Sequence, residues 1–64
     1  MEINIKDKLR SLRQQKNVTQ EALAKHLGIT PQSVGKWERG EGFPDITLLP
    51  NIAIYFGVTV DELL

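Results

Sequence analysis

The 64-residue sequence predicts an all-α fold of five short helices that form one domain over residues 1–64. Apolar residues recur three and four positions apart, which is the spacing of one face of an α-helix. No stretch alternates polar and apolar residues in the manner of a half-buried strand. Gly, Asn and Thr interrupt the apolar pattern at short intervals, in positions where helices end and begin. A chain of this size buries roughly 60% of its unfolded surface, so we expect one small core.

The first helix is expected from Ile5 to Lys16. Asn4 can cap its N-terminus, with Asp7 three residues later in a box-like arrangement. Asn17 follows the helix, and Asn is tolerated in the left-handed conformation that commonly terminates one. The apolar stripe of this helix has the spacing i, i+4, i+7 and consists of Ile5, Leu9 and Leu12.

The second helix is expected from Gln20 to Leu27, with Thr19 as its cap. Gly28 suits the left-handed position directly after its end. Its inward residues are Leu23, Ala24 and Leu27.

The third helix is expected to begin only two residues later, with Thr30 as its cap. Pro31 then occupies the first helical position, where the missing N–H costs nothing. Gly35 lies inside the helix and should cost it roughly 1 kcal/mol relative to Ala. Val34 and Trp37 form the apolar side, and Gly40 ends the helix.

The fourth helix has two candidate caps, Asp45 and Thr47. With Asp45 as the cap, Pro50 would be the fifth helical residue and would delete a backbone hydrogen bond. With Thr47 as the cap, Pro50 falls in the first turn and deletes none, so Thr47 is preferred. The helix is expected to run to Phe56 and to end at Gly57. Its inward residues are Leu49, Ile52, Ala53 and Phe56.

The fifth helix is expected after Thr59, because Thr59-Val60-Asp61-Glu62 has the T-x-x-E pattern of a capping box. The sequence ends at Leu64, inside this helix. Two alternatives are therefore open, a minimal protein or the N-terminal domain of a longer one.

Residues 20–39 have the pattern of a helix-turn-helix, two short helices joined by Gly28-Ile29-Thr30. Ala24 is small where the two helices must approach closely, and Gly28 allows the left-handed turn between them. One side of both helices is apolar and carries Leu23, Leu27, Ile29, Val34 and Trp37. The other side of the third helix is polar and carries Gln32, Ser33 and Lys36. Trp37 is therefore expected in the core rather than on the surface.

The charges are distributed unevenly although the net charge is zero. All eight Lys and Arg lie in residues 1–40 with four of the eight Asp and Glu, so this part carries +4. Residues 41–64 hold the other four acids and carry −4. The asymmetry hints at a nucleic-acid face on the first forty residues. Four of the basic residues are expected to form no more than a solvated face, Lys6, Lys8, Arg10 and Lys16.

The residue inventory argues against an enzyme. Cysteine is absent and His26 is the only histidine, so thiol catalysis, disulfides and a metal site are not expected. There is no Gly-rich phosphate loop, and the domain is too small for a sizeable pocket. We therefore expect no catalysis, no cofactor and no small-molecule substrate. No apolar stretch approaches the ~18–20 residues of a membrane helix, so we expect a cytoplasmic protein that does not bind a membrane.

Several linked segments resemble the phage-repressor and Cro-type helix-turn-helix domains, also called the XRE family, over essentially the whole chain. These segments are Leu12-Arg13, Val18-Thr19-Gln20-Glu21-Ala22-Leu23-Ala24, Gly28-Ile29-Thr30, Ser33-Val34, Trp37-Glu38-Arg39-Gly40, Pro44-Asp45, Leu49-Pro50, Ile52-Ala53 and the stretch from Tyr55 to Leu64. The resemblance implies a compact five-helix lambda-repressor-like domain with the helix-turn-helix at helices 2 and 3. It also implies binding to double-stranded operator DNA as a symmetric homodimer, usually by a transcriptional repressor.

The resemblance assigns roles to particular positions. The base-facing positions of the third, recognition helix are matched by Gln32, Ser33 and Lys36. The DNA phosphate contacts are matched by Gln20, Thr30 and Arg39. A structural ion pair between the first and third helices is matched by Arg13 and Glu38. Pro31 departs from the family, because some relatives have a base-reading side chain there.

Two readings of function follow. The first is sequence-specific DNA binding by a transcriptional regulator, expected to be a repressor that binds a pseudo-palindromic operator as a dimer. The dimer contact is expected at the fifth helix and the loop before it, where Val58, Val60 and Leu63 exceed what a short terminal helix needs. The alternative is a helix-turn-helix module that binds a protein instead of an operator, which the zero net charge slightly favours.

Overall fold

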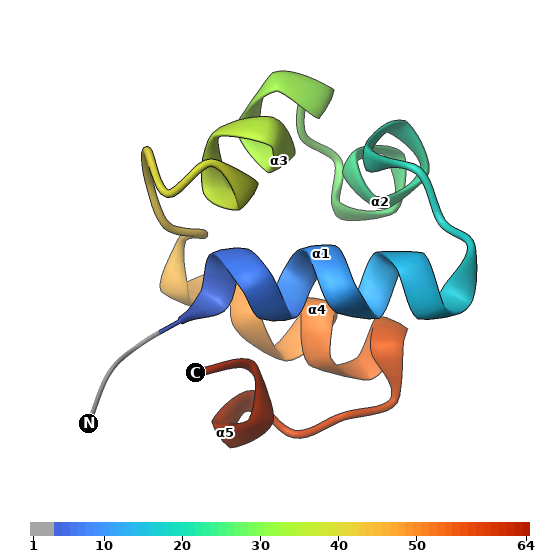
Figure 1. Ribbon diagram of the computed structural model, residues 1–64, viewed down its shortest axis with the longest axis vertical. Coiled ribbons are helices and arrows are strands. Elements are labelled where there is room, and N and C mark those ends of the chain that lie inside the picture. Colours follow the sequence, from blue (N-terminus) through green and yellow to red (C-terminus); the bar gives the residue numbers. More distant parts are fainter. Residues whose placement is uncertain (1–3) are drawn as a thin grey trace.

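The computed structural model describes residues 4–64, and within them the chain is all helical and contains no strand. The elements in chain order are α1 (Ile5–Lys16), α2 (Gln20–Leu27), α3 (Pro31–Glu38), the 3-10 turn η1 (Ile46–Leu48), α4 (Leu49–Phe56) and α5 (Val60–Leu63). In Figure 1, α1 runs across the middle, with α2 and α3 on one side of it and α4 and α5 on the other. The prediction of an all-α, five-helix fold is confirmed.

Four residues in the left-handed backbone conformation lie just after α1, α2, α3 and α4, as the sequence predicts. Their φ angles are 56° at Asn17, 73° at Gly28, 75° at Gly40 and 69° at Gly57. After each of them, the next N–H donates to a carbonyl five residues back, at distances of 2.9 to 3.0 Å. These bonds satisfy carbonyls that a helix end would otherwise leave without a partner. The chain therefore changes direction within one or two residues, so five helices fit into 64 residues.

Three threonines cap helices as predicted, but the predicted cap at Asn4 is wrong. The backbones of Thr19, Thr30 and Thr59 are extended, with ψ angles of 163°, 150° and 161°, and each side chain accepts a backbone N–H of its helix. Asn4 has a ψ angle of 54° and makes no side-chain cap hydrogen bond. Only an extended backbone directs a short polar side chain back toward the first turn. The box with Glu62 after Thr59 is confirmed.

The start of α4 differs from the preferred prediction. Thr47 does not cap a helix; its N–H and its hydroxyl both donate to Asp45 Oδ1, at 2.9 and 2.8 Å. Those two bonds lower the pKa of the Asp45 carboxyl. Asp45 caps the 3-10 turn, and α4 begins after it with Pro50 in its first turn. The intervening turn resolves the conflict between Asp45 and Pro50, because the two residues no longer belong to one continuous α-helix.

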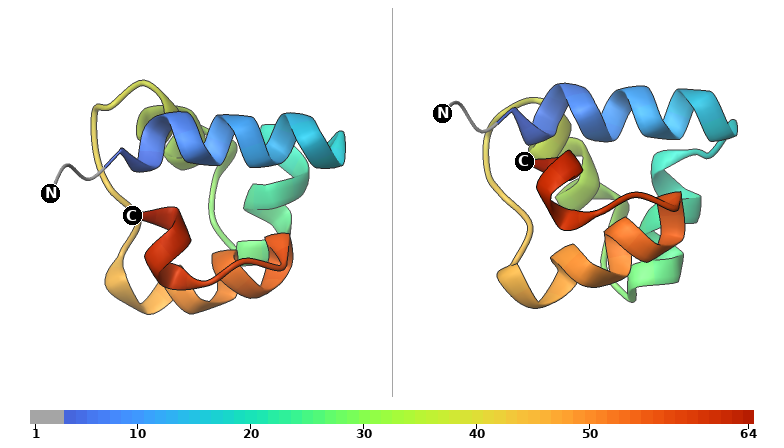
Figure 2. Two further views of the ribbon diagram at one scale, coloured as in Figure 1. Left: turned by 60° about the horizontal axis from the view of Figure 1, so that its bottom comes forward. Right: turned by 90° about the horizontal axis from the view of Figure 1, so that it is seen from below.

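The core lies where α1 meets the other helices. Its fully buried residues come from every helix, and they include Leu9, Leu23, Val34, Ile52 and Leu63. Trp37 is 6% exposed, so its predicted place in the core is confirmed. Leu12, Leu27 and Leu49, which were expected to point inward, pack at the edge of this core and remain partly exposed. In both views of Figure 2, α1 lies along the upper edge, α4 lies at the lower edge, and α5 lies between them.

None of the helices in residues 4–64 is long and apolar enough to cross a lipid bilayer. The longest, α1, has 12 residues, and a bilayer requires about 20.

Candidate nucleic-acid interface

Helix α3 has one buried and one exposed face. Val34 and Trp37 are buried against the core, whereas Gln32 and Lys36 are exposed. Residues four apart lie on the same face of a helix, one turn from each other. The structure therefore brings the side chains of Gln32 and Lys36 together on an outward strip that no other element of residues 4–64 covers.

The start of α3 is fixed by a local hydrogen-bond network. The Thr30 hydroxyl accepts the N–H of Ser33 at 3.3 Å and lies 3.1 Å from the Ser33 hydroxyl. Ser33 is half-buried, in contrast to Gln32 beside it. The structure thus gives Thr30 and Ser33 a shared role in capping α3. Both hydroxyls can accept or donate further bonds outward.

The turn between α2 and α3 sets how the two helices face each other. Ala24 on α2 is 1% exposed, which is possible because its side chain is only a methyl group. Gly28 has a φ angle of 73°, and Ile29 donates back to the Ala24 carbonyl at 3.0 Å. This turn leaves the N-terminus of α2 close to α3, since the side chain of Gln20 reaches that of Glu38.

Glu38 is the centre of a buried ion pair that joins α1 to α3. Arg13 donates through Nε to Glu38 Oε2 at 2.5 Å and through Nη2 to Oε1 at 2.7 Å. The remaining Nη1 of Arg13 donates to the Val18 carbonyl at 2.9 Å. The exposed fractions of the side chains are 14% for Arg13 and 2% for Glu38. A carboxylate so buried requires these donors, because an unpaired charge is costly away from water.

Two opposing effects act on the pKa of Glu38. Burial raises it, and the hydrogen bonds from Arg13 and from Gln20 lower it, together with the positive charges of Arg13 and Arg10. The net result is a pKa below the ordinary value, so Glu38 is ionised at neutral pH. The hydrogen bond to Glu38 likewise raises the pKa of Arg13.

Gln20 lies at the first position of α2, and its side chain faces α3. Its Nε2 donates to Glu38 Oε1 at 3.2 Å. The backbone N–H groups of the first turn of α2 point outward from the same end, where the helix dipole favours an anion. Beside them is an open depression of about 490 Å³, lined by Arg13, Thr19, Gln20, Glu21 and Pro31.

Arg39, directly after α3, is exposed but not unpaired. Its Nε donates to Glu41 Oε2 at 2.6 Å. Its Nη1 lies 3.0 Å from the point where a Cβ at Gly35 would be, and Gln20 Oε1 lies 3.6 Å from that point. The side chains of Gln20 and Arg39 therefore converge over Gly35, which was expected only to weaken the helix.

Sequence reasoning missed two members of this region. Arg10, expected on a solvated face, donates from Nη2 to the Glu38 carbonyl at 3.0 Å and so caps the end of α3. Glu41 was assigned no role, although its carboxylate forms an ion pair with Arg39. A signal for Arg10 was present, because it lies three residues before Arg13 and hence on the same face of α1. Lys16 also differs from the expectation, since its Nζ donates to the Tyr55 carbonyl at 2.7 Å.

Gly35→Ala should stabilise the domain. Replacing Gly by Ala inside a helix gains about 1 kcal/mol, and for so small a domain that raises the melting temperature by about 4–8 °C. The new Cβ would lie 3.0 Å from the flexible end of Arg39, which can move aside, and in ordinary contact with Gln20 Oε1 at 3.6 Å. Gly28→Ala is the matched control and should lower the melting temperature, because Gly28 has a positive φ angle. Thermal unfolding followed by circular dichroism measures both. An unchanged or lower melting temperature for Gly35→Ala would contradict this account.

Within residues 4–64, no three side chains that could ligate a metal ion come together. This region combines three features. They are the polar outward strip on α3, the N-terminus of α2 beside it, and the buried Arg13–Glu38 ion pair beneath.

Comparison with known proteins gives a consistent result. The family model described as "Helix-turn-helix" matches residues 9–63. The chain is 47% identical to the HTH-type transcriptional activator BcrR of Enterococcus faecalis over 64 residues, which are 100% of this chain and 30% of BcrR. It is 38% identical to the cryptic phage CTXphi transcriptional repressor RstR of Vibrio cholerae over 61 residues, which are 95% of this chain and 54% of RstR. The chain thus spans about a third to a half of these relatives.

Two solved structures share the fold. The clp gene regulator ClgR from Corynebacterium glutamicum has a TM-score of 0.83 and 29% identity, over 92% of this chain and 63% of that chain. Hydroxypropylphosphonic acid epoxidase from S. wedmorenis has a TM-score of 0.82 and 37% identity, over 92% of this chain and 31% of that one. The likeness to the epoxidase is confined to under a third of its chain. BcrR and RstR are both named as transcriptional regulators, which agrees with the expected function class.

Proposed function

Because the chain belongs to the helix-turn-helix family of transcriptional regulators, we propose that it binds specific DNA sequences through α3. The observation that carries the proposal is the two-sided nature of this helix. Its inner face is part of the core, and its outer face presents Gln32 and Lys36 one turn apart. A helix with such an outer strip fits the major groove, which admits an α-helix and exposes a distinct pattern of groups for each base pair.

The base contacts in this proposal are made by Gln32, Ser33 and Lys36. A Gln amide can pair with the N6 and N7 edge of adenine, and a Lys ammonium can donate to O6 and N7 of guanine. Ser33 can contribute a single further hydrogen bond beside its bond to Thr30. Gln32 is next to the N-terminus of α3, so it enters the groove first.

The phosphate contacts are assigned to Gln20, Thr30 and Arg39, which surround the reading face. Gln20 lies at the N-terminus of α2, where outward N–H groups and the helix dipole favour a phosphate. The depression lined by Arg13, Thr19 and Gln20 lies directly at this end of the helix. Such contacts hold the register of the protein on the duplex without reading its sequence.

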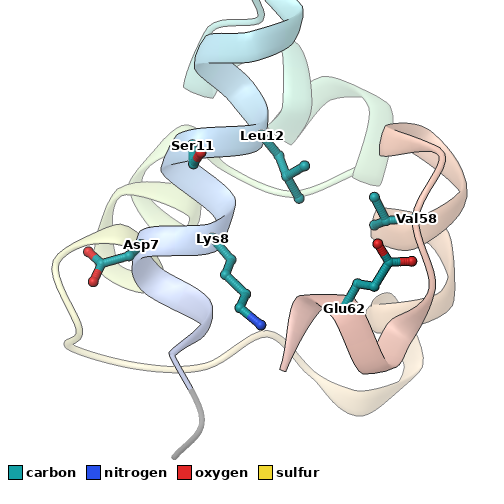
Figure 3. Close-up of a pocket in the computed structure, with 6 residues that line it drawn as sticks. All are labelled: Asp7, Lys8, Ser11, Leu12, Val58 and Glu62. Carbon is teal, nitrogen blue, oxygen red and sulfur yellow. The ribbon is translucent and has the colours of Figure 1, made fainter.

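The bound form is proposed to be a dimer on a pseudo-palindrome, because one short helix reads few base pairs. Leu63 was expected to help form the dimer contact, but it is 0% exposed and belongs to the core of its own chain. Val58 and Val60 remain partly exposed. Val58 and Leu12 of α1 line a depression of about 400 Å³. The two side chains lie on opposite sides of it (Figure 3), and we propose the dimer contact there.

The direction of regulation is proposed to be repression, as in RstR, although BcrR is named an activator. Occupying an operator is sufficient to block access to the DNA behind it. Activation requires an additional surface that contacts another protein.

Binding of a protein partner is the second candidate function. Among residues 4–64, three large apolar side chains are exposed, Phe43 by 69%, Ile46 by 77% and Ile54 by 77%. Exposed apolar side chains that cluster can mark a protein interaction site. On this alternative the polar strip of α3 would be an ordinary solvated face.

Selection of binding sites from a random DNA pool, followed by fluorescence anisotropy on the enriched duplex, tests the proposal. We expect enriched sites with two inverted half-sites about 34 Å apart, one helical turn of DNA. Affinity for the enriched duplex should exceed that for a scrambled duplex at both low and moderate salt. No enrichment, with weak binding to random duplexes that disappears at moderate salt, would favour the protein-binding alternative. Enriched sites without symmetry would contradict the dimer.

A further inference from the structure

Arg39 and Glu41 form an exposed ion pair at the edge of the reading face. The distance from Arg39 Nε to Glu41 Oε2 is 2.6 Å, and the side chains are 56% and 55% exposed. Glu41 is held in place by its backbone, since its N–H donates to the Lys36 carbonyl at 2.9 Å after the left-handed turn at Gly40. The carboxylate is therefore attached by a short side chain to a fixed point at the end of α3.

We propose that Glu41 competes with DNA phosphate for the Arg39 guanidinium and so limits the affinity of this domain for DNA. The inference rests on the proposed function. In the free protein the Arg39 charge is neutralised by Glu41, so a phosphate that binds Arg39 must first replace this carboxylate. A phosphate contact stabilises a complex largely by releasing counterions from the DNA. At Arg39 the net gain in binding free energy is smaller, because the Arg39–Glu41 ion pair must be broken first.

Glu41 differs from the other acids near α3. Glu38 is buried and bound by Arg13, so it is unavailable to DNA and to Arg39. Glu21 is exposed in the first turn of α2 and forms no ion pair within residues 4–64. Of these three acids, Glu41 alone combines exposure with a bond to a residue assigned to phosphate binding.

The effect should be independent of DNA sequence. A phosphate contact carries no information about the bases, so Glu41 weakens specific and random binding by the same factor. It thereby lowers the occupancy of random DNA without changing the ratio of the affinity for the specific site to the affinity for random DNA. This fits a domain whose net charge is zero and whose discrimination must come from base contacts.

The test is Glu41→Gln, which removes the charge and keeps the shape. An exposed ion pair corresponds to about a twofold to fivefold change in a binding constant, so we expect affinity to rise by about that factor on enriched and scrambled duplexes alike. The slope of log affinity against log salt should become steeper by up to about one per subunit. Glu41→Ala should give the same result, and unchanged thermal unfolding shows that the fold is intact.

An Arg39→Gln background separates the proposed competition from simple charge repulsion. We expect most of the gain from Glu41→Gln to disappear there, because no guanidinium remains to be released. Glu21→Gln is the matched control; it removes an exposed acid without an ion pair, and its effect should be the same in both backgrounds. A Glu41→Gln gain that persists in the Arg39→Gln background, or no gain at all, overturns the inference.

The outcomes also separate this inference from the proposed function. If the unmodified domain does not bind DNA above background, both are wrong. If it binds and Arg39→Gln weakens binding, while Glu41→Gln leaves affinity unchanged, only the competition is wrong. If Arg39→Gln leaves affinity unchanged, the phosphate assignment of Arg39 is wrong and the competition is overturned with it.

Discussion

Arg13→Ala should lower the free energy of unfolding by about 3 kcal/mol, the lower end of the range for breaking a buried ion pair. The substitution leaves the Glu38 carboxylate, 2% exposed, without either of its strongest donors. Arg10 and Gln20 remain close to Glu38 and offset part of the loss, which is the reason for choosing the lower end. A domain of this size has only a few kcal/mol of stability, so much of the variant should be unfolded at moderate temperature.

The decrease in the free energy of unfolding caused by Arg13→Ala should also depend on pH. In the unmodified domain the folded-state pKa of Glu38 lies below its ordinary value of 4.5. Its ionised form therefore adds stability above the unfolded-state pKa, and this contribution is lost as pH falls through the lower folded-state pKa. Burial is already the largest single effect on the pKa of Glu38. Without Arg13 it should no longer be outweighed, so the pKa of Glu38 should rise in the variant. The difference between variant and unmodified domain should thus be full at pH 7, begin to shrink as pH falls through the raised folded-state pKa of the variant, and shrink further below about pH 4.5, where the unmodified domain loses its own contribution.

Urea unfolding at pH 7 and at acid pH measures this difference directly. Arg39→Ala is a matched control, because it also removes an Arg from an Arg–Glu pair, but one whose side chains are about half exposed. It should cost less than about 1 kcal/mol, as exposed pairs do. Equal decreases in the free energy of unfolding for Arg13→Ala and Arg39→Ala would contradict the claim that burial makes the Arg13–Glu38 pair more important for stability. A loss for Arg13→Ala that stays constant with pH would contradict the role assigned to Glu38.

Lys36→Ala should cost about 1–3 kcal/mol of binding free energy on the selected DNA site and relax the preference at one base pair. Gln32→Ala should do the same at a different base pair. Both side chains are exposed on α3, so neither substitution removes core packing. The stability of the fold should therefore be unchanged, which separates the loss of base contacts from unfolding.

Affinity measured on the selected duplex and on a panel of single-base variants checks this prediction. Lys25→Ala is the control, since Lys25 is an exposed lysine in the last turn of α2. It should leave the base preferences unchanged. A uniform loss of affinity across the panel for Lys36→Ala, with a shallower salt dependence, would mean that Lys36 contacts a phosphate. Its assignment to base reading would then be wrong.

The helix bounds were predictable because they depend on local chemistry. Thr19 precedes α2 and caps it from an extended backbone, and Gly28 follows α2 and ends it in the left-handed conformation. Neither assignment requires knowledge of distant residues. The two wrong caps, at Asn4 and Thr47, arose where residue type alone does not fix the backbone angle. Asn4 has the correct side chain on an unsuitable backbone, and Thr47 donates to Asp45 instead of capping.

The candidate site was less predictable, because it depends on the reach of long side chains. Arg10 is separated from the Glu38 carbonyl by 28 positions, and no periodic pattern connects them. The pairing of Arg39 with Glu41 depends on the turn at Gly40 as well as on two flexible side chains. Gly35 carried a local signal of low helix propensity. Its second property, the space it gives to Gln20 and Arg39, exists only in the folded chain.

The brevity of α2 and α3 has a consequence for engineering. Each has 8 residues, whereas an isolated helix in water is only marginally stable below about 12–15 residues. A peptide cut from residues 20–39 should therefore lack the geometry of its parent, so the reading surface is not transferable as a fragment. The outer side chains of α3 are nevertheless separate from the inner ones. A library that randomises Gln32 and Lys36 on the intact scaffold can change the target while the scaffold itself stays constant.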